Sequence, residues 1–420
     1  MSFRIYISSV MIDVKCYSKL FVRLLLFLSA VDTINGFFLN KGIESPIGIL
    51  FKAFIMLVAI RILIANSKFK GLMFFTITYI SVFLMFIVLN TDSQLAPTLT
   101  HLFKFVNIVF VYYAAVVILK LGFIQEKELQ TIFYVNSVVL LLNVYSGLLG
   151  IGYYAYGANL GCKGFIYAHN EMSGMMAVLF GVSYFFLYVV QNSNRIIVFL
   201  SNLIFLVAAL LVSTKAGILL VLISLILVPF VNMKYGMFRT FLRASKLRII
   251  IFLIVLCLVI YYSYLLLDYS GAIERWVYFF EKNGANAIYS SRDSYWAEEK
   301  LEWEEGNIGI KLFGMGGDRT VEMDQADTLL NYGIFGVIIV YSFYLSLVVK
   351  AFRHRKKSKY AKFVLGMNLF ILAASCFAGH LLFSGLMGIP FALMNAMIFY
   401  SKMKNYYWCD KNRVSLEVIK

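Results

Sequence analysis

Long apolar runs set the strongest limit on how this chain can fold. Residues 196–231 contain a single charged side chain, Lys215, although the run is too long for one membrane crossing. Hydrophobic residues make up 61% of the 420 residues and charged residues only 14%, whereas about a quarter of an ordinary soluble domain is charged. A soluble protein cannot cover so much apolar side chain with polar surface. The sequence therefore excludes a soluble fold and predicts a membrane protein that crosses the bilayer many times.

The apolar runs predict twelve transmembrane helices, because a helix needs about 20 mostly apolar residues to cross the bilayer. The twelve runs are residues 20–38, 46–65, 70–89, 99–120, 131–150, 171–191, 195–213, 214–232, 248–267, 326–349, 362–379 and 382–401. The expected fold class is an all-α polytopic membrane protein, with residues 1–420 as one integral membrane domain. The seventh and eighth spans share one apolar run, so a tight turn is expected near residues 213–217. The last two spans are joined by almost no chain.

The distribution of Lys and Arg predicts which ends of the spans lie in the cytoplasm. With the N-terminus placed inside, the cytoplasmic segments hold 25 of the 38 Lys and Arg residues, and the short loops on the other side hold only Lys41, Lys163 and Lys215. An excess of Lys and Arg in cytoplasmic loops is the usual pattern of multi-pass proteins. We therefore expect an even number of spans with both termini in the cytoplasm. The net charge of +16 is then a signal of topology, and no nucleic-acid partner is expected.

Residues 268–325 form one long polar loop between the ninth and tenth spans, on the outer side of the membrane. The loop carries twelve acidic and six basic residues, and a loop of this length is usually functional or disordered. Residues 293–303 combine helix-forming residues with an apolar side made by Trp296, Leu301 and Trp303, which predicts a short surface helix. Residues 311–317 are expected to form a glycine-rich turn.

Lys215 is the clearest candidate for function among the charges near the spans. It is the only charge in its apolar run, and its small neighbours let a ligand approach. Ionisable groups persist in a membrane when they face a cavity, a partner or a substrate, although a lysine also reaches the interface by extending its side chain. Four further cations in or near spans are interpreted mainly as interfacial or packing charges, namely Arg23, Lys52, Arg61 and Lys104.

Two arginines of the long loop, Arg275 and Arg292, are candidates for binding phosphate. A guanidinium binds phosphate through a planar fork of N–H groups and keeps its charge at any working pH. On local sequence alone, an ordinary solvated loop arginine is the better explanation for both.

Three acidic residues, Glu322, Asp324 and Asp327, open the tenth span. Acidic side chains are favoured at a helix N-terminus, which explains one of the three but not all of them. A carboxylate here is also able to accept a proton from a substrate hydroxyl. His380 is expected at the outer junction of the last two spans, one helical turn from Ser384 on the same face. A lone histidine in an apolar bundle is more often structural than a base.

The candidate residues share the outer side of the membrane, where Lys163, His169 and Glu171 are also expected. A mixed cationic and acidic site beside lipid suits an amphiphilic anionic substrate, because cations hold phosphate while an acid or histidine moves a proton. The five cysteines are scattered, with no C-x-x-C pair and no His/Cys cluster. Neither a disulfide framework nor a zinc site is expected.

In their order and membrane side, several segments resemble motifs of the bacterial O-antigen polymerase and ligase superfamily of membrane glycosyltransferases. These segments are Gly164-Phe165 with His169-Asn170-Glu171, Ser213-Thr214-Lys215-Ala216-Gly217, Ser291-Arg292-Asp293 with Leu312-Phe313-Gly314-Met315-Gly316, Glu322-Met323-Asp324 with Asp327 and Tyr332-Gly333, and Gly379-His380-Leu381-Leu382-Phe383-Ser384. Many members have arginine where this chain has Lys215, which keeps the charge and loses the bidentate fork. The ligases typically carry a His-Asn pair near residue 324, and this chain has none there.

The resemblance implies an O-antigen polymerase in the bacterial inner membrane, with its active face in the periplasm. It implies an inverting transfer of a growing glycan from undecaprenyl diphosphate onto a new lipid-linked repeat unit, with no metal and no cofactor. The cations expected to hold the diphosphate are Lys215, Arg292 and Arg275. The candidates for the base that activates the acceptor hydroxyl are, in order, Asp327, Glu322, Asp324 and His380.

The expected partners are undecaprenyl-diphosphate-linked repeat units, membrane lipids, a chain-length regulator protein and a flippase. Two alternatives stay open. One is an O-antigen ligase, which moves finished glycan to lipid A core. The other, less favoured, is a flippase for the lipid-linked oligosaccharide. A transporter predicts charges near the middle of the membrane and internal repeats. Such charges are comparatively few in the sequence, and no repeat is visible.

Overall fold

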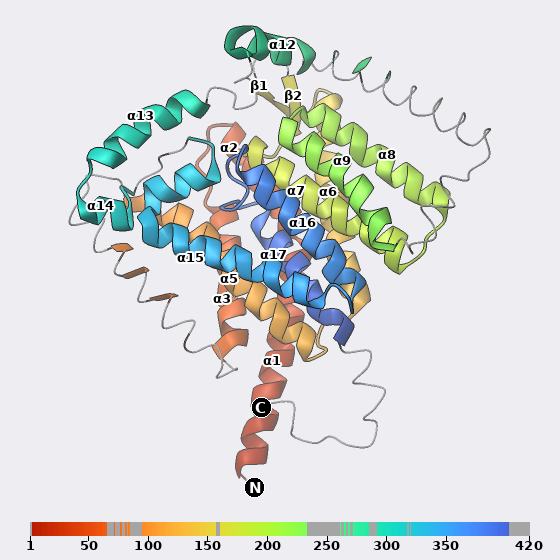
Figure 1. The fold of residues 1–420 in the computed structure, drawn as a ribbon. Coiled ribbons are helices and arrows are strands. Elements are labelled where there is room, and N and C mark those ends of the chain that lie inside the picture. Colours follow the sequence, from red (N-terminus) through yellow and green to blue (C-terminus); the bar gives the residue numbers. More distant parts are fainter. Residues whose placement is uncertain are drawn as a thin grey trace.

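The structure, a computed structural model, describes residues 2–64, 95–156, 160–232, 272–284, 292–316, 319 and 321–402, with isolated positions between 71 and 84 and between 261 and 268. These residues are almost entirely helical (Figure 1). The helices are α1 (Ser2–Leu26), α2 (Leu28–Asn40), α3 (Ile47–Ile64), α5 (Leu95–Lys120), α6 (Glu126–Leu148), α7 (His169–Phe185), η2 (Phe186–Val190), α8 (Arg195–Val212), α9 (Lys215–Asn232), α12 (Ala272–Asn283), α13 (Arg292–Glu305), α14 (Ile308–Phe313), α15 (Asp324–His354), α16 (Lys359–Ser375), α17 (Gly388–Ala396) and η4 (Met397–Lys402). Two short strands, β1 (Tyr153–Tyr156) and β2 (Leu160–Gly164), pair in antiparallel fashion.

Six helices in the described part of the chain are long and apolar enough to cross a membrane. They are α3, α5, α6, α7 together with η2, α8 and α15. The pair α1 and α2, bent by 49° at their junction, adds a seventh candidate if the two form one span. These seven agree with the expected spans 20–38, 46–65, 99–120, 131–150, 171–191, 195–213 and 326–349. The chain is a largely helical protein with the composition of a multi-pass membrane protein.

The twelve spans expected from the sequence are not all present as candidates. The expected spans 214–232 and 382–401 correspond to shorter apolar helices, and the expected span 362–379 corresponds to α16, which has 17 residues. The chain leaves helical geometry over residues 376–387, so the last apolar stretch is divided between two helices and an irregular connection. The expected spans 70–89 and 248–267 lie largely outside the described residues.

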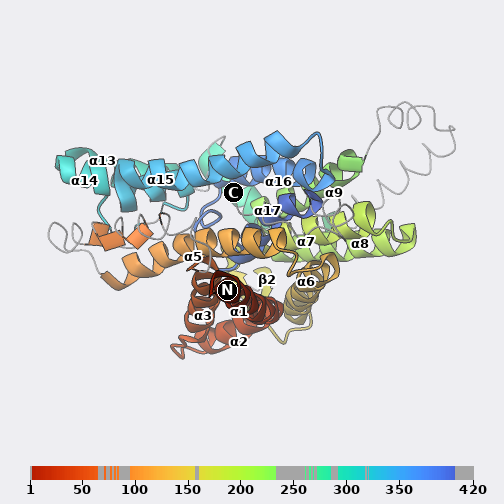
Figure 2. The same ribbon diagram turned by 90° about the horizontal axis from the view of Figure 1, so that it is seen from below.

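The centre of the bundle is formed by α5 and α7. In the apolar 18-residue stretch of α5, and in that of α7 with η2, 83% of the residues are buried, against 33% in α3 and in α15. α5 packs on α3 and α17, while α7 packs on α6, α8 and α9 (Figure 2). Large apolar side chains on the outer helices, such as Leu50, Ile196 and Ile338, are exposed. Such faces are expected where a helix meets lipid, since lipid tails are as apolar as leucine.

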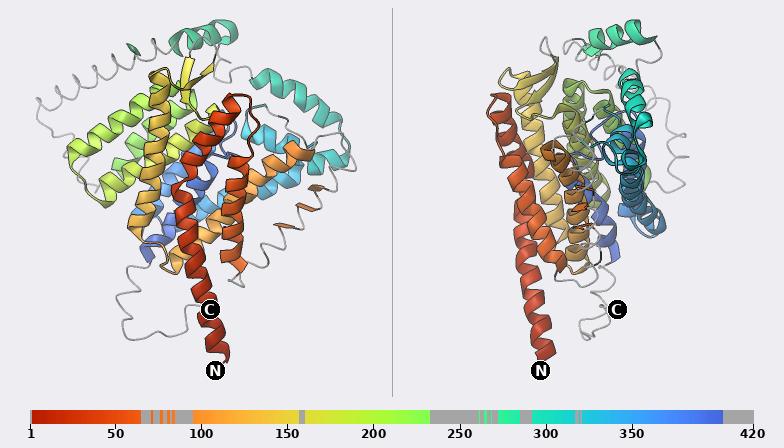
Figure 3. Two further views of the ribbon diagram at one scale, coloured as in Figure 1. Left: turned by 180° about the vertical axis from the view of Figure 1, so that it is seen from behind. Right: turned by 90° about the vertical axis from the view of Figure 1, so that its left-hand side faces the viewer.

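The short strands and α12 mark one end of the bundle, opposite the start of α1 (Figures 1 and 3). We call this end the hairpin end. The turn between α8 and α9 agrees with the expectation for residues 213–217, because Ser213 ends α8 in the left-handed conformation (φ 59°) and α9 begins at Lys215. The expected surface helix at 293–303 is α13. The glycine-rich turn is shorter than expected and begins only at Gly314, because Lys311 to Phe313 belong to α14.

Gly164, at the end of β2, fixes the strand pair against α6. Its φ is +61°, a backbone conformation that residues other than glycine rarely adopt. A Cβ added here would lie 2.0 Å from the carbonyl oxygen of Asn143. The next residue, Phe165, donates its N–H to Asn143 Oδ1 at 3.3 Å. The close approach of the two backbones therefore requires glycine at this position.

Gly164→Ala is expected to lower the midpoint of thermal unfolding of the purified protein well below that of a Gly42→Ala control. Gly42 has a φ of +75° but open space around its Cα, so the control carries only the left-handed strain, about 1–2 kcal/mol. The Gly164 variant adds a backbone clash to the same strain. Equal midpoints for the two variants would show that the strand pair is not held in this way.

Candidate functional site

The candidate site is organised around the irregular connection between α16 and α17, residues 376–387. The sequence expectation that His380 and Ser384 share one helical face is wrong, because this segment is not helical and His380 has a φ of 63°. Backbone that leaves helical geometry exposes N–H groups that need other partners, and at membrane depth it is tolerated only where the protein supplies them. For the N–H groups of His380, Leu381, Leu382 and Leu386, the partners are two buried carboxylates.

Asp324, the first residue of α15, is the first of these carboxylates. Its Oδ1 accepts the backbone N–H of His380 at 2.7 Å, and its Oδ2 accepts those of Leu381 and Leu382 at 3.0 and 2.9 Å. The side chain is almost completely buried, with 1% of its residue surface exposed. Both oxygens of Asp324 are therefore engaged in holding the connection.

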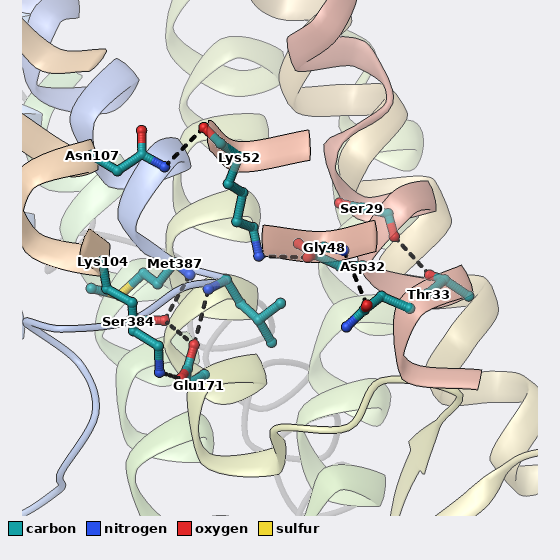
Figure 4. Close-up of polar contacts among 12 residues, drawn as sticks. Ser29, Asp32, Thr33, Gly48, Lys52, Lys104, Asn107, Glu171, Ser384 and Met387 are labelled. Carbon is teal, nitrogen blue, oxygen red and sulfur yellow. Dashed lines mark hydrogen bonds and ion pairs between the residues drawn. The ribbon is translucent and has the colours of Figure 1, made fainter. Parts of the chain in front are cut away.

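Glu171, in the first turn of α7, is the second carboxylate. Its Oε2 accepts the hydroxyl of Ser384 at 3.1 Å and the backbone N–H of Leu386 at 3.0 Å. Its Oε1 forms an ion pair with Lys104 Nζ of α5 at 2.7 Å (Figure 4). Glu171 thus ties the far end of the connection to α5 and α7.

Arg292 links the long loop to the same connection. Its Nη2 and Nε contact Glu322 Oε2 at 2.8 and 3.3 Å, and its Nη1 donates to the carbonyl oxygen of Phe377. The Arg292 side chain is largely buried, whereas 44% of the Glu322 side chain is exposed. Glu322 has a φ of 58°, so two residues with strained backbone, Glu322 and His380, lie in this one region.

Asp327 has a local role in the structure. Its Oδ1 accepts the backbone N–H of Val321 at 2.6 Å, which closes the chain onto the first turn of α15. The three acids that open α15 therefore have three separate partners: backbone of the connection for Asp324, backbone before the helix for Asp327, and a guanidinium for Glu322.

An aromatic stack joins the connection to α5 and α15. The ring of Phe383 stacks on His101 with centroids 4.5 Å apart and on Tyr332 at 5.6 Å. His101 Nδ1 and the hydroxyl of Tyr332 are hydrogen-bonded at 2.6 Å. The connection is thus fixed by contacts from three helices that are far apart in the sequence.

A second arginine, Arg319, holds α13 in place. Its guanidinium bonds Glu299 at 2.8 Å and both carboxylate oxygens of Glu302 at 2.5 and 2.6 Å. The hydrogen bonds to Glu302, and then those to Glu299, raise the pKa of Arg319 above its ordinary value against the opposing effect of burial. Arg319 therefore serves the loop itself, whereas Arg292 reaches the connection.

A cavity of about 100 Å³ lies beside Ser384 and Gly385, between α3, α5 and the start of α17. Its polar lining residues are Asn35, Lys52, Thr100, Lys104, Asn107 and Ser384. Lys52 Nζ pairs with the buried Asp32 of α2 at 2.5 Å (Figure 4). The interpretation of Lys52 and Lys104 as interfacial or packing charges does not predict that each lysine pairs with a buried carboxylate beside a cavity. The available signal was the presence of acidic residues in two other apolar runs, Asp32 and Glu171.

The expected site residues divide into two groups. Arg292, Glu322, Asp324 and His380 come together at the connection, and Asp327 lies one turn along α15. Lys215 belongs to a different element: it is the first residue of α9, and its neighbour Thr214 is hydrogen-bonded to Ser173 of α7 at 2.7 Å. Arg275 belongs to α12, and its side chain lies outside the described residues.

Within the described part of the chain, no group of three or more His, Cys, Asp or Glu side chains is arranged to hold a metal ion. Comparison of the sequence with protein-family models gives no match, and comparison with curated proteins gives none either. The site is therefore interpreted from its own geometry and from the motif resemblance.

Asp324→Asn is expected to lower the free energy of unfolding by about 1–3 kcal/mol, because an amide has one acceptor oxygen and leaves a buried backbone N–H unpaired. The matched control is Glu304→Gln, since Glu304 forms an exposed pair with Lys300 at 3.2 Å and such pairs contribute about 0–1 kcal/mol. Denaturant unfolding of the purified protein measures both. A loss no larger than that of the control would contradict the structural role of Asp324.

The Lys104–Glu171 pair is expected to show strong coupling in a double-mutant cycle. Lys104→Met leaves Glu171 as an unpaired buried charge, which costs about 3–5 kcal/mol. Adding Glu171→Gln removes that charge and keeps an acceptor for Ser384 and Leu386, so the double variant should regain part of the lost stability. Additive effects of the two changes in thermal unfolding would argue against a buried pair.

Proposed function

We propose that this protein is a membrane glycosyltransferase of the O-antigen polymerase type. In this proposal it lies in the bacterial inner membrane with both termini in the cytoplasm and its hairpin end in the periplasm. It transfers the growing glycan from undecaprenyl diphosphate to the non-reducing end of a new lipid-linked repeat unit. The observation that carries the proposal is the convergence of Arg292, Glu322 and His380 with two buried carboxylates at one connection, beside apolar helices.

Positive charge near the breaking bond is the main requirement of this reaction, because the leaving group is a diphosphate. Arg292 meets it with a guanidinium that stays charged and presents a planar fork. Its present partner, Glu322, is nearly half exposed, so a phosphate oxygen can replace that carboxylate at small cost. Lys215 and Arg275 are the other proposed diphosphate ligands.

The acceptor hydroxyl needs a base. The three acids Asp327, Glu322 and Asp324 already bond backbone N–H groups or Arg292. His380 differs from them, because its hydrogen bond to Asp324 comes from its backbone N–H and none of the described residues hydrogen-bonds to its ring. These contacts favour His380, the last of the four candidates expected from the sequence, over the three acids.

The proposed partners follow from the same reaction. Undecaprenyl-diphosphate-linked repeat units serve as both donor and acceptor, so the protein would work after the flippase that delivers them to the outer face. A chain-length regulator would act on the same growing glycan. The transfer is written as inverting, since direct displacement at the anomeric carbon reverses its configuration.

Arg292→Ala is expected to abolish chain extension, because the diphosphate loses its guanidinium, while the protein stays in the membrane at the wild-type level. Arg319→Ala is the matched control, since Arg319 is another loop arginine and its side chain forms ion pairs with Glu299 and Glu302 of α13. Lys215→Ala should likewise abolish extension, and Lys215→Arg should be tolerated. The measurement is the glycan ladder of a strain that carries each variant as its only copy.

The deletion strain separates the alternatives. If the protein is a polymerase, the deletion strain should make surface polysaccharide capped with a single repeat unit. If it is a ligase, the deletion strain should leave polymer on the carrier lipid. Loss of a flippase leaves single repeat units on the cytoplasmic side. An unchanged ladder, or wild-type chain lengths in both the Arg292→Ala and Lys215→Ala strains, would overturn the proposal.

A further inference from the structure

The cavity beside Gly385 is lined by a side chain, Asn107, that has an unsatisfied hydrogen-bond acceptor. Asn107 is 4% exposed, and its Nδ2 donates to the carbonyl oxygen of Lys52 at 3.5 Å. Its Oδ1 is buried and has no hydrogen-bond partner among the described residues. An unpartnered buried oxygen costs free energy and indicates a missing donor.

The charges around the cavity are already compensated. Lys52 is paired with Asp32, and Lys104 is paired with Glu171. Asp32 Oδ2 is a second buried acceptor that lacks a partner among the described residues. An anion entering here would compete with two carboxylates and would face the oxygen of Asn107. Asn107 Oδ1 therefore lacks a hydrogen-bond donor, and a phosphate group cannot supply one when it is fully ionised.

A hydroxyl group satisfies both sides of this arrangement, because it donates one hydrogen bond and accepts others. One hydroxyl can donate to Asn107 Oδ1, and other hydroxyls of the same ligand can accept from the ammonium groups of Lys52 and Lys104, each of which has three donors. The volume of about 100 Å³ holds several hydroxyl-sized groups, since one water needs about 10–15 Å³. Ile49, Phe103 and Ile389 also line the cavity and offer apolar surface to the C–H face of a ring.

We propose that this cavity binds a neutral sugar residue through its hydroxyl groups, as a subsite separate from the cations that hold the diphosphate. The assignment of that sugar to the substrate glycan rests on the proposed function. Ser384 and Gly385 form the wall that the cavity shares with the 376–387 connection. A bound sugar is thereby set beside the segment that carries His380.

The test is saturation-transfer NMR on the full chain in lipid nanodiscs, with glucose, galactose, N-acetylglucosamine and rhamnose as the probes. At least one sugar should give a signal with the wild type. Asn107→Leu should reduce it at least fivefold, and an excess of inorganic diphosphate should leave it unchanged. Asn202→Leu is the matched control, because Asn202 Oδ1 is also buried without a partner among the described residues but belongs to α8, outside the cavity lining.

Gly385→Ala is a second variant that keeps the fold. Its added Cβ would lie 3.4 Å from Glu171 Oε2, 3.6 Å from Lys104 Cε and 3.8 Å from Lys52 Nζ, all ordinary contacts. The methyl group occupies the cavity and should also reduce the signal. Absence of any sugar signal, an unchanged signal in Asn107→Leu and Gly385→Ala, or displacement by diphosphate would each overturn the inference.

The two proposals fail in different ways. Sugar binding that persists in a protein whose deletion leaves the glycan ladder unchanged would defeat only the polymerase function. A normal dependence of chain extension on Arg292 without any sugar signal would defeat only the cavity assignment.

Discussion

Two buried carboxylates hold the part of the molecule on which the candidate site depends. Asp324 and Glu171 begin different helices, and both direct their oxygens at backbone N–H groups of residues 376–387. Without these acceptors, an irregular segment between two apolar helices would leave unpaired N–H groups in a poorly solvated place. The helix N-termini favour the negative charges as well. One electrostatic arrangement therefore allows the chain to be irregular where the candidate site lies.

The cavity and the Arg292 region are two sides of this same connection. Phe377 contacts Arg292, while Ser384 and Gly385 line the cavity. A small displacement of the segment would change both places at once, which suits a reaction in which leaving group and acceptor must be positioned together. The stack of Phe383 on His101 restrains such displacement. The rigidity of the site thus comes from aromatic packing as well as from charge.

Sequence patterns were sufficient to predict most of the helices but not the geometry of the candidate site. Apolar runs located α3, α5, α6, α7, α8 and α15, and the excess length of the run 196–231 located the turn at 213–217. Hydropathy could not show that residues 376–387 leave the helix, because their apolar side chains resemble a span and their N–H partners lie on other helices. Lys52 and Lys104 resembled interfacial lysines for the same reason, since Asp32 and Glu171 are 20 and 67 residues away from them. Contacts between residues that are far apart in the sequence cannot be predicted from a local sequence pattern.

The two ion pairs beside the cavity, Asp32–Lys52 and Lys104–Glu171, can form at different stages of synthesis. Asp32 precedes Lys52 by 20 residues, so the first pair is complete as soon as α3 is made, and these two charges can enter the membrane as a pair. Lys104 is made 67 residues before Glu171, and the hydroxyl of Ser384 arrives 213 residues after Glu171. The bundle therefore inserts α5 and α6 before the Lys104–Glu171 pair can form. Its polar interior is completed only when the C-terminal helices join it.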